Sequence, residues 1–220
     1  PPRLRRQRQM CIRDRSGNVS FYNQTKEIGI KPTPAIGGVG LIKNYKKMVT
    51  MNFKEIDNQV LVIGKTEGHI DQSLFARVIL NENNGPPPEV NLFNEKNNGQ
   101  TLLNLIEKDY IKSAHDVSLG GIITAISKMC IKGNKGIELK IPKFLINKIE
   151  YFFAEDQGRY IIEVSSEDLK EVSKILDKNA VHYDVIGKII DKDMIIDQKT
   201  KVSIDELKSY NSNWLKEYMV

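Results

Sequence analysis

Residues 110–131 read YIKSAHDVSLGGIITAISKMCI and change periodicity halfway along. The first part, Tyr110–Ala114, has the alternation of a short strand. From Leu119 to Ile131 the apolar residues recur at helical spacing, at Ile122, Ile123, Ile126, Met129 and Cys130. A strand that passes through a polar turn into an amphipathic helix is typical of domains that mix α and β elements.

The segments on either side extend this mixture. Further strands are predicted at Val39–Ile42, Lys47–Phe53, Gln59–Thr66, Gly136–Ile141 and Arg159–Val164. Helices are predicted at Gln72–Leu80, Leu92–Lys108 and Glu167–Asn179. Val185–Ile190 and Met194–Asp197 are predicted to pair as the closing strands, with a partly helical tail at Val202–Tyr218. The expected fold class is therefore α/β (α+β), a mixed sheet with flanking helices.

Two proline-containing segments are predicted to interrupt the helices and strands. Residues 32–34, Pro-Thr-Pro, disfavour helix and predict an extended linker after a strand end at Val19–Tyr22. Residues 83–88, Asn-Asn-Gly-Pro-Pro-Pro, predict a surface loop, because proline lacks an N–H and fixes the backbone. We expect residues 16–34 to end one domain and link to the next, residues 35–197 to form an α/β domain, and residues 198–220 to form a tail.

The net charge of +5 belongs to one short segment. Six of the eight Arg lie in residues 1–15, where Asp14 is the single acid, so residues 16–220 carry 27 charges of each sign. Residues 9–15, QMCIRDR, resemble translated sequencing-adapter DNA, and we interpret residues 1–15 as a non-native artefact. A basic leader is the alternative. The neutral body argues against nucleic acid as a partner, which would require basic residues outside this segment.

Cysteine content and hydropathy bear on location. Cys11 and Cys130 have no partner at metal-site or redox spacing, and Cys130 is predicted to be a small buried hydrophobe. The sequence holds no run of eighteen apolar residues and no segment that reads as a signal peptide. We expect a reducing, cytoplasmic location and no membrane partner.

Residues 16–23, Ser-Gly-Asn-Val-Ser-Phe-Tyr-Asn, hold residue types that suit a nucleotide site. Gly17 would let the backbone approach a phosphate, Asn18 offers a carbonyl oxygen to Mg²⁺, and Ser20 offers a hydroxyl. The alternative is an ordinary turn that enters a strand. Residues 36–40, Ile-Gly-Gly-Val-Gly, would form either a phosphate nest or a tight crossing at a domain junction, and they match neither a Walker A loop nor a Rossmann fingerprint.

The polar turn inside residues 110–131 is a further candidate site. Ser118 is placed to cap the helix that follows, and the free N–H groups at a helix start suit an anion. His115 and Asp116 would then lie beside that anion. A capping network made by the same residues is the alternative.

A last candidate segment is residues 152–160, Phe-Phe-Ala-Glu-Asp-Gln-Gly-Arg-Tyr. Glu155 and Asp156 beside Arg159 would bind a cation or a ribose, or would neutralise one another where a strand begins. His69 and His182 have no nearby partner in the sequence and are expected at the surface.

The order and spacing of these segments are more specific than any one of them. They are GNVSFYN at 17–23, PTPAIGGVG at 32–40, PPP at 86–88, AHDVSLGG at 114–121, EDQGRY at 155–160 and VIGKI at 185–189. This series resembles the C-terminal end of the large subunit of phosphoribosylformylglycinamidine synthase over residues 16–220. That family is similar in fold to aminoimidazole ribonucleotide synthetase and selenophosphate synthetase.

The resemblance implies a place for the chain in a larger enzyme. Such a subunit has two pseudo-repeated halves, each an ATP-binding-type domain followed by a smaller α/β domain. Residues 16–34 would supply the last strand of the second ATP-binding-type domain, and residues 35–197 the second smaller domain. The family's general base histidine, Mg²⁺ carboxylates and main substrate loops have no counterpart here. We therefore expect the chain alone to be inactive.

The resemblance also implies a reaction, a ligase step of purine biosynthesis. ATP phosphorylates the formamide oxygen of formylglycinamide ribonucleotide, and ammonia released from glutamine then displaces phosphate. Gly17 would contact ATP, Asn18 would bind Mg²⁺ and Ser20 would contact the ribonucleotide. A glutaminase subunit and a small accessory subunit are the implied partners.

No catalytic residue is assigned in this chain. The resemblance implies that Glu155–Gln157 is the counterpart of a substrate-binding segment in the first half, and neither this segment nor His115 is given a catalytic role. One alternative to the synthase is a related ATP-dependent enzyme such as aminoimidazole ribonucleotide synthetase, which the direct join of residues 17–23 to Pro-Thr-Pro disfavours. A non-catalytic structural module is another.

Overall fold

The computed structural model describes residues 24–29, 37–42, 44–140, 142 and 147–219, the side chains of residues 24–25 and 215–217 excepted. The chain divides into two compact units, residues 1–41 and 42–220. In the first unit, β1 (Gln24–Thr25) and β2 (Ile28–Gly29) form an antiparallel pair. The strand predicted at Val19–Tyr22 lies outside the described residues, and the domain bounds expected from the sequence stay a prediction.

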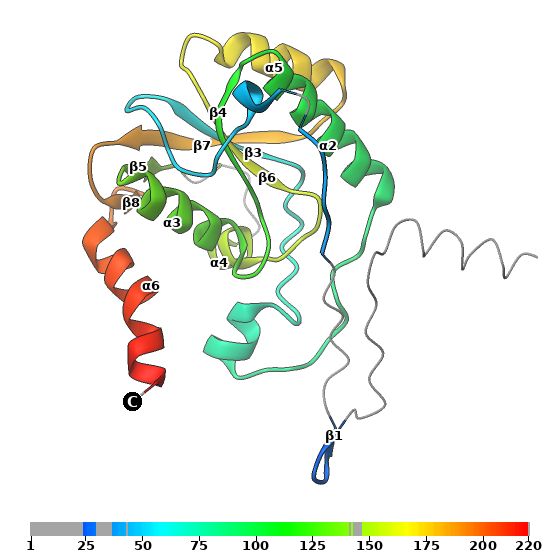
Figure 1. Cartoon of the computed structure of the whole chain (residues 1–220), viewed down its shortest axis with the longest axis vertical. Helices are drawn as coiled ribbons and strands as arrows, with labels where there is room; N and C mark the ends of the chain where they lie inside the picture. Colours follow the sequence, from blue (N-terminus) through cyan, green and yellow to red (C-terminus); the bar gives the residue numbers. More distant parts are fainter. Residues whose placement is uncertain (1–23, 30–36, 43, 141, 143–146, 220) are drawn as a thin grey trace, which may run out of the picture. The chain divides into compact units, whose positions relative to one another are not determined.

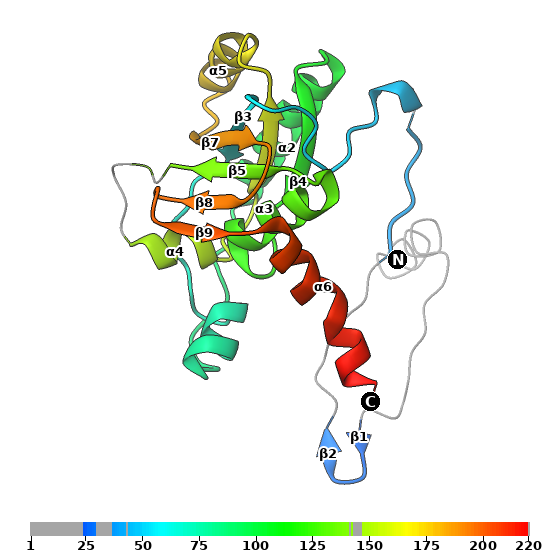
Figure 2. The same cartoon turned by 90° about the vertical axis from the view of Figure 1, so that its left-hand side faces the viewer.

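The second unit is built on one mixed sheet of seven strands (Figures 1 and 2). Its strand order is β4-β6-β3-β7-β5-β8-β9, and neighbours are antiparallel except for the parallel pair β5 and β8. The strands are β3 (Gln59–Ile63), β4 (Ile111–Asp116), β5 (Gly136–Leu139), β6 (Tyr160–Val164), β7 (Tyr183–Ile190), β8 (Met194–Ile196) and β9 (Thr200–Val202). The sheet confirms the expected mixed α/β class.

Helices cover both faces of this sheet (Figure 1). Helices α2 (Leu92–Glu107) and α5 (Leu169–Lys178) pack on one face. Helices α3 (Gly121–Gly133) and α4 (Lys148–Phe153) pack on the other, where α6 (Ile204–Tyr218) contacts α3. Two short helices complete the unit, the 3-10 helix η1 (Tyr45–Lys47) and the π-helix η2 (Ala76–Leu80).

Strand β3 joins the two apolar layers. Val60 and Val62 lie in the cluster beneath α3, whereas Leu61 and Ile63 lie in the cluster beneath α2 and α5. Successive side chains of a strand point to opposite faces, so a strand buried on both faces is apolar at every position. β3 pairs with β6 on one side and β7 on the other, which makes it a central strand.

Two predicted strands are absent. Val39–Ile42 is exposed and irregular, because its apolar side chains have no facing strand in the described part of the chain. In the segment predicted as Lys47–Phe53, contact with the sheet is a single bridge from Thr50 to Ser113. The N–H groups that follow, of Lys54 and Glu55, donate to the Glu163 carboxylate rather than to a strand.

Three other predictions differ from the structure. β7 and β8 do not pair with each other, because β5 lies between them. The helix expected from Gln72 forms only after two turn residues, and most of it is the π-helix η2. Helix α4 and strand β9 had no clear sequence pattern, since each is too short for a period to show. In the described part of the chain, no helix is both long and apolar enough to cross a membrane.

Candidate functional site

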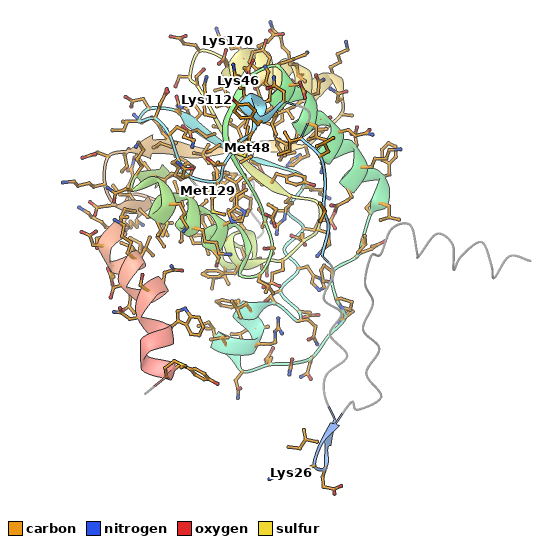
Figure 3. All side chains as sticks on the ribbon, viewed as in Figure 1. Lys26, Lys46, Met48, Lys112, Met129 and Lys170 are labelled. Carbon is orange, nitrogen blue, oxygen red and sulfur yellow. The ribbon has the colours of Figure 1, made fainter. Side chains whose placement is uncertain are left out.

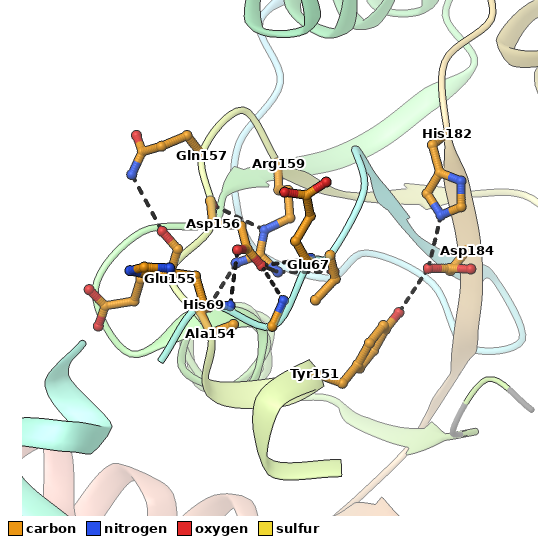
Figure 4. A network of polar contacts seen from close by, with 12 residues as sticks. Glu67, His69, Tyr151, Ala154, Glu155, Asp156, Gln157, Arg159, His182 and Asp184 are labelled. Carbon is orange, nitrogen blue, oxygen red and sulfur yellow. Dashed lines mark hydrogen bonds and ion pairs between the residues drawn. The ribbon is translucent and has the colours of Figure 1, made fainter. Parts of the chain in front are cut away.

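The turn at residues 154–159, which joins α4 to β6, lies at the centre of a network of polar contacts (Figure 4). Beside it lies a pocket of about 500 Å³. Its walls come from residues 65–69, from the start of α2 and from the turn itself, and the lining residues are Lys65, Glu67, Gly68, His69, Glu89, Asn91, Asn94, Glu95, Asn98, Asp156 and Gln157.

Arg159 anchors the turn from inside. Its side chain is fully buried, and its guanidinium donates to the Asp156 carbonyl at 3.1 Å, the Ala154 carbonyl at 2.7 Å and the Thr66 hydroxyl at 3.0 Å. Burial lowers the pKa of Arg159, and the neighbouring Asp156 carboxylate, 3.7 Å away, opposes that shift. A buried cation needs such partners, and these donations fix the shape of the turn.

The Asp156 carboxylate closes a nest of backbone donors. It accepts from the N–H groups of Glu67 and Gly68 at 3.0 and 3.1 Å, and from that of His69 at 3.1 Å. Successive N–H groups that converge on one carboxylate make an anion site whose anion is built into the protein. The sequence left three functions open for Glu155 and Asp156 beside Arg159, which were binding a cation, binding a ribose, or neutralising one another. For Asp156 the structure supports neutralisation, by Arg159 and by the three N–H groups.

Glu155 occupies the start of helix α3. Its Oε1 accepts from the N–H of Gly120 at 2.8 Å and from the N–H of Leu74 at 2.7 Å. The anion expected at this helix start is therefore a side chain of the same chain. The sequence predicted that Ser118 caps this helix with its hydroxyl, and that prediction is wrong. The N-cap is Gly120, in a left-handed conformation. Ser118 contributes its carbonyl, which accepts from the N–H of Gly121.

His115 and Asp116 lie outside this pocket and bond to each other. His115 Nδ1 is 3.0 Å from Asp116 Oδ1, so the ring donates from Nδ1 to the carboxylate. His115 Nε2 is buried and has no hydrogen-bond partner among the described residues. The two residues form a local pair rather than the wall of an anion site.

Close approach of two backbone segments shapes the pocket floor. Asn98 Nδ2 donates to the Gly158 carbonyl at 2.9 Å, which ties α2 to the turn. Gly64 has φ +92°, and a Cβ at this position would lie 2.7 Å from the same carbonyl. Glycine is required at residue 64 for both conformation and space.

The pocket lining has carboxylates and amides rather than cations. Glu67, Glu89, Glu95 and Asp156 outnumber Lys65, which itself pairs with Glu67 at 3.0 Å. Such a lining favours a ligand that donates hydrogen bonds over one that carries phosphate groups, because carboxylates accept hydrogen bonds and repel negative charge. In the parts of the chain that the structure describes, no group of three or more His, Cys, Asp or Glu residues could hold a metal ion.

A second pocket, of about 340 Å³, lies beside Ile111 and Lys112, where β4 begins. Lys46, Met48 and Lys112 line it (Figure 3), together with Lys47 and Lys54. Lys47 pairs with Asp109, and Lys54 donates to Thr50 and Asn52, so two of these four cations are already bound within the chain.

The remaining sequence predictions meet different outcomes. Gly17, Asn18 and Ser20 lie outside the described residues. At Gly37, Gly38 and Gly40 a Cβ would meet no atom of the described residues within 4 Å, and residue 36 lies outside those residues, so the nest or crossing expected at 36–40 stays a prediction. His182 is exposed, as expected, near Asp184 (Figure 4). His69 is not free, because its Nε2 bonds to the Pro86 carbonyl at 3.0 Å.

Glu163 is a buried polar residue that the sequence reading missed. Its carboxylate accepts from Lys54 N, Glu55 N, Asn58 Nδ2 and Ser113 Oγ, at 2.7 to 3.0 Å. The available signal was a lone charge within YIIEV at residues 160–164, a strand that is otherwise apolar. A charge in such a run indicates a buried, hydrogen-bonded group.

Comparison with known proteins shows which family this domain is similar to. Residues 55–198 match the family described as AIR synthase related protein, C-terminal domain. The chain is 71% identical to phosphoribosylformylglycinamidine synthase subunit PurL of Pelagibacter ubique and 37% identical to that of Bartonella henselae, in each case over 93% of this chain and 28% of the relative. The chain thus spans under a third of the length of these relatives.

Solved structures show the same fold. Thermotoga maritima PurL complexed with FGAR superposes with a TM-score of 0.63 at 20% identity, over 74% of this chain and 29% of that one. The structure of PurLQS from the same organism gives 0.60 at 17% identity, over 74% and 28%. The residues matched by the family, 55–198, hold strands β3 to β8 and helices η2 and α2 to α5, whereas β9 and α6 follow them. The chain therefore belongs to the AIR synthase related protein family, of which it carries the C-terminal domain.

Proposed function

We propose that the chain is the C-terminal part of a phosphoribosylformylglycinamidine synthase subunit. The observation that carries the proposal is 71% identity over 93% of this chain to the PurL subunit of Pelagibacter ubique. Formylglycinamide ribonucleotide, ATP and ammonia from glutamine are the substrates of the whole enzyme, and formylglycinamidine ribonucleotide is its product. Phosphate is a better leaving group than oxide, so ATP makes the substitution possible.

The described part of the chain supports a scaffold role within that enzyme. Its carboxylates at the polar turn, Glu155 and Asp156, are occupied by backbone N–H groups. The pocket beside them is rich in acids and has no cluster fit for a metal in the described residues. These features support the proposal that the reacting groups come from the rest of the subunit and that this chain alone is inactive.

The nucleotide contacts of this chain belong to residues 17–20. We assign Gly17 to ATP, Asn18 to Mg²⁺ and Ser20 to the ribonucleotide, all three outside the described residues. An amide oxygen is a chemically suitable ligand for Mg²⁺, which would offset phosphate charge in phosphoryl transfer. In a full-length subunit, Asn18→Ala should raise the Mg²⁺ concentration needed for half-maximal rate, whereas Asn23→Ala provides the neighbouring control.

A glutaminase subunit and a small accessory subunit are the proposed partners, in the cytoplasm. The existence of a PurLQS structure for Thermotoga maritima supports an assembly of this kind. Co-purification of a full-length subunit with each partner, analysed by mass, tests it.

The activity is tested with a hybrid subunit. The 204 matched residues of this chain replace those of the Pelagibacter relative, and ATP- and ammonia-dependent amidine formation is measured for the hybrid and for the 220-residue chain. We expect turnover from the hybrid and none from the chain. A folded hybrid without turnover, beside an active parent, would contradict the assignment, as would turnover by the chain alone.

A further inference from the structure

Residues 74–93 carry an unusual density of exposed apolar side chains. This segment, which we call the apolar platform, includes η2, the loop after it and the first turn of α2. Its exposed members are Leu74, Val78, Ile79, Leu80, Val90, Leu92 and Phe93, with 41 to 77% of each residue accessible. A segment that exposes this many apolar side chains is a candidate interaction site.

The platform is held in place by its polar groups. The N–H of Leu74 donates to Glu155 at 2.7 Å, and Gln72 Nε2 donates to the carbonyls of Asn83 and Gly85 at 3.2 Å. His69 bonds to the Pro86 carbonyl. These hydrogen bonds fix the backbone of the segment against residues 69–72 and the turn at 154–159, while its apolar side chains stay exposed. The surface is therefore pre-organised for a partner.

An aromatic contact fixes the start of η2. The rings of Phe75 and Phe153 lie 4.8 Å apart, which ties the platform to α4. The same region joins the acidic pocket, because Glu89 and Asn91 line that pocket and belong to the platform loop. A partner seated on the platform would border the pocket.

We propose that the apolar platform is the surface on which the rest of the synthase subunit docks, so that the pocket becomes part of a cleft between domains. The occupant follows from size: the chain spans 28% of the relatives that it matches, and the remaining 72% of such a subunit needs a contact surface here. The proposal rests on the proposed function, since it takes this chain to be part of a synthase subunit.

The test compares the 220-residue chain with the hybrid subunit. Ile79→Cys is placed in η2, which the Phe75–Phe153 contact ties to α4. The matched control is Lys170→Cys on α5, a helix on the opposite face of the sheet from α4 (Figure 3). Cys11 is replaced by Ser, and Cys130 is fully buried. The rate of maleimide labelling is read by mass spectrometry of the peptide that contains each new cysteine.

We expect residue 79 to label at least tenfold more slowly in the hybrid than in the chain, and residue 170 to label equally fast in both. Equal rates at residue 79 would overturn the proposal. So would protection in the 220-residue chain that rises with concentration alongside a dimer mass, because a second copy would then be the occupant. If the hybrid does not fold, cysteines at the aligned positions of the Pelagibacter subunit give the same reading.

The outcome is separable from that of the proposed function. An active hybrid with an unprotected residue 79 would leave the synthase assignment standing and reject the platform. A protected residue 79 in a folded but inactive hybrid would leave the platform standing and reject the synthase assignment.

Discussion

Glu155 accepts a hydrogen bond from the N–H of Gly120 across 35 residues of sequence, and thereby supplies the negative charge at the start of α3. The same oxygen accepts from Leu74, so one carboxylate joins a helix, a turn and the apolar platform. Interaction with a helix N-terminus and two N–H donors makes this carboxylate a structural group.

Glu155→Ala should destabilise the chain by about 1–3 kcal/mol, because two N–H groups lose their acceptor. Glu155→Gln should be milder, since an amide oxygen can still accept. Guanidinium unfolding followed by circular dichroism gives both values. Glu167→Ala, an exposed change elsewhere, is the control, and equal effects of the alanine changes at 155 and 167 would refute the role of Glu155.

Glu163→Ala should be more damaging than Glu155→Ala. Four donors surround the buried Glu163 carboxylate, and each unsatisfied donor costs about 1–3 kcal/mol. Ser113→Ala removes one of the donors and should cost about 1 kcal/mol. In a double-mutant cycle the two changes should be non-additive. Simple additivity would show that the Ser113 contact contributes nothing.

Gly64→Ala should destabilise the chain by about 1–3 kcal/mol, since it forces alanine to φ +92° and a Cβ to within 2.7 Å of the Gly158 carbonyl. Gly99→Ala makes the same chemical change within α2, where the nearest atom is the Tyr160 hydroxyl at 3.5 Å. Helix propensity predicts that this control is stabilising by about 0.8–1 kcal/mol. Thermal melts of the pair should shift in opposite directions, and a common direction would contradict the argument.

Cys130 should resist thiol reagents in the native state. Burial raises the pKa of its thiol to about 12, so the reactive thiolate is scarce at pH 8. In a Cys11→Ser variant, Ellman's reagent should detect no thiol in buffer and one in denaturant. Rapid native labelling would show that the α3 core opens readily.

The same thiol makes stability depend on alkaline pH. The folded pKa is raised above the value of 9.0 for an unperturbed cysteine, so its contribution is complete below pH 9. That contribution is lost as the pH rises from 9 toward 12. Unfolding of Cys130→Ala should show a weaker loss of stability over this range than the parent chain.

The sequence was sufficient for elements whose pattern is local. Strand β3 was predicted from the apolar run 59–63, and α2, α3 and α5 from helical periodicity. The position of β5 between β7 and β8 was not predictable, because strand order depends on distant pairing. The backbone at Lys54 and Glu55, where the predicted strand at Lys47–Phe53 ends, is bonded to Glu163, more than a hundred residues away.

The candidate site was predictable in composition but not in role. Glu155, Asp156 and Arg159 were recognised together, and the choice between ligand binding and neutralisation stayed open. That choice is decided by N–H donors in residues 67–74 and by the N–H of Gly120, all of which are remote in sequence from the two carboxylates. Positions that require glycine, such as Gly64, likewise become visible only when the facing carbonyl is known.

The central position of β3 also matters for the order in which the strands of the sheet are synthesised. β3 is made early, yet its neighbour β6 follows only after η2, α2, α3 and α4, and its other neighbour β7 only after α5 as well. A ribosome therefore releases this buried central strand long before either of its neighbours has been made. During that interval β3 depends on chaperones or on transient helix contacts, and the rate of translation through residues 64–190 becomes a determinant of yield.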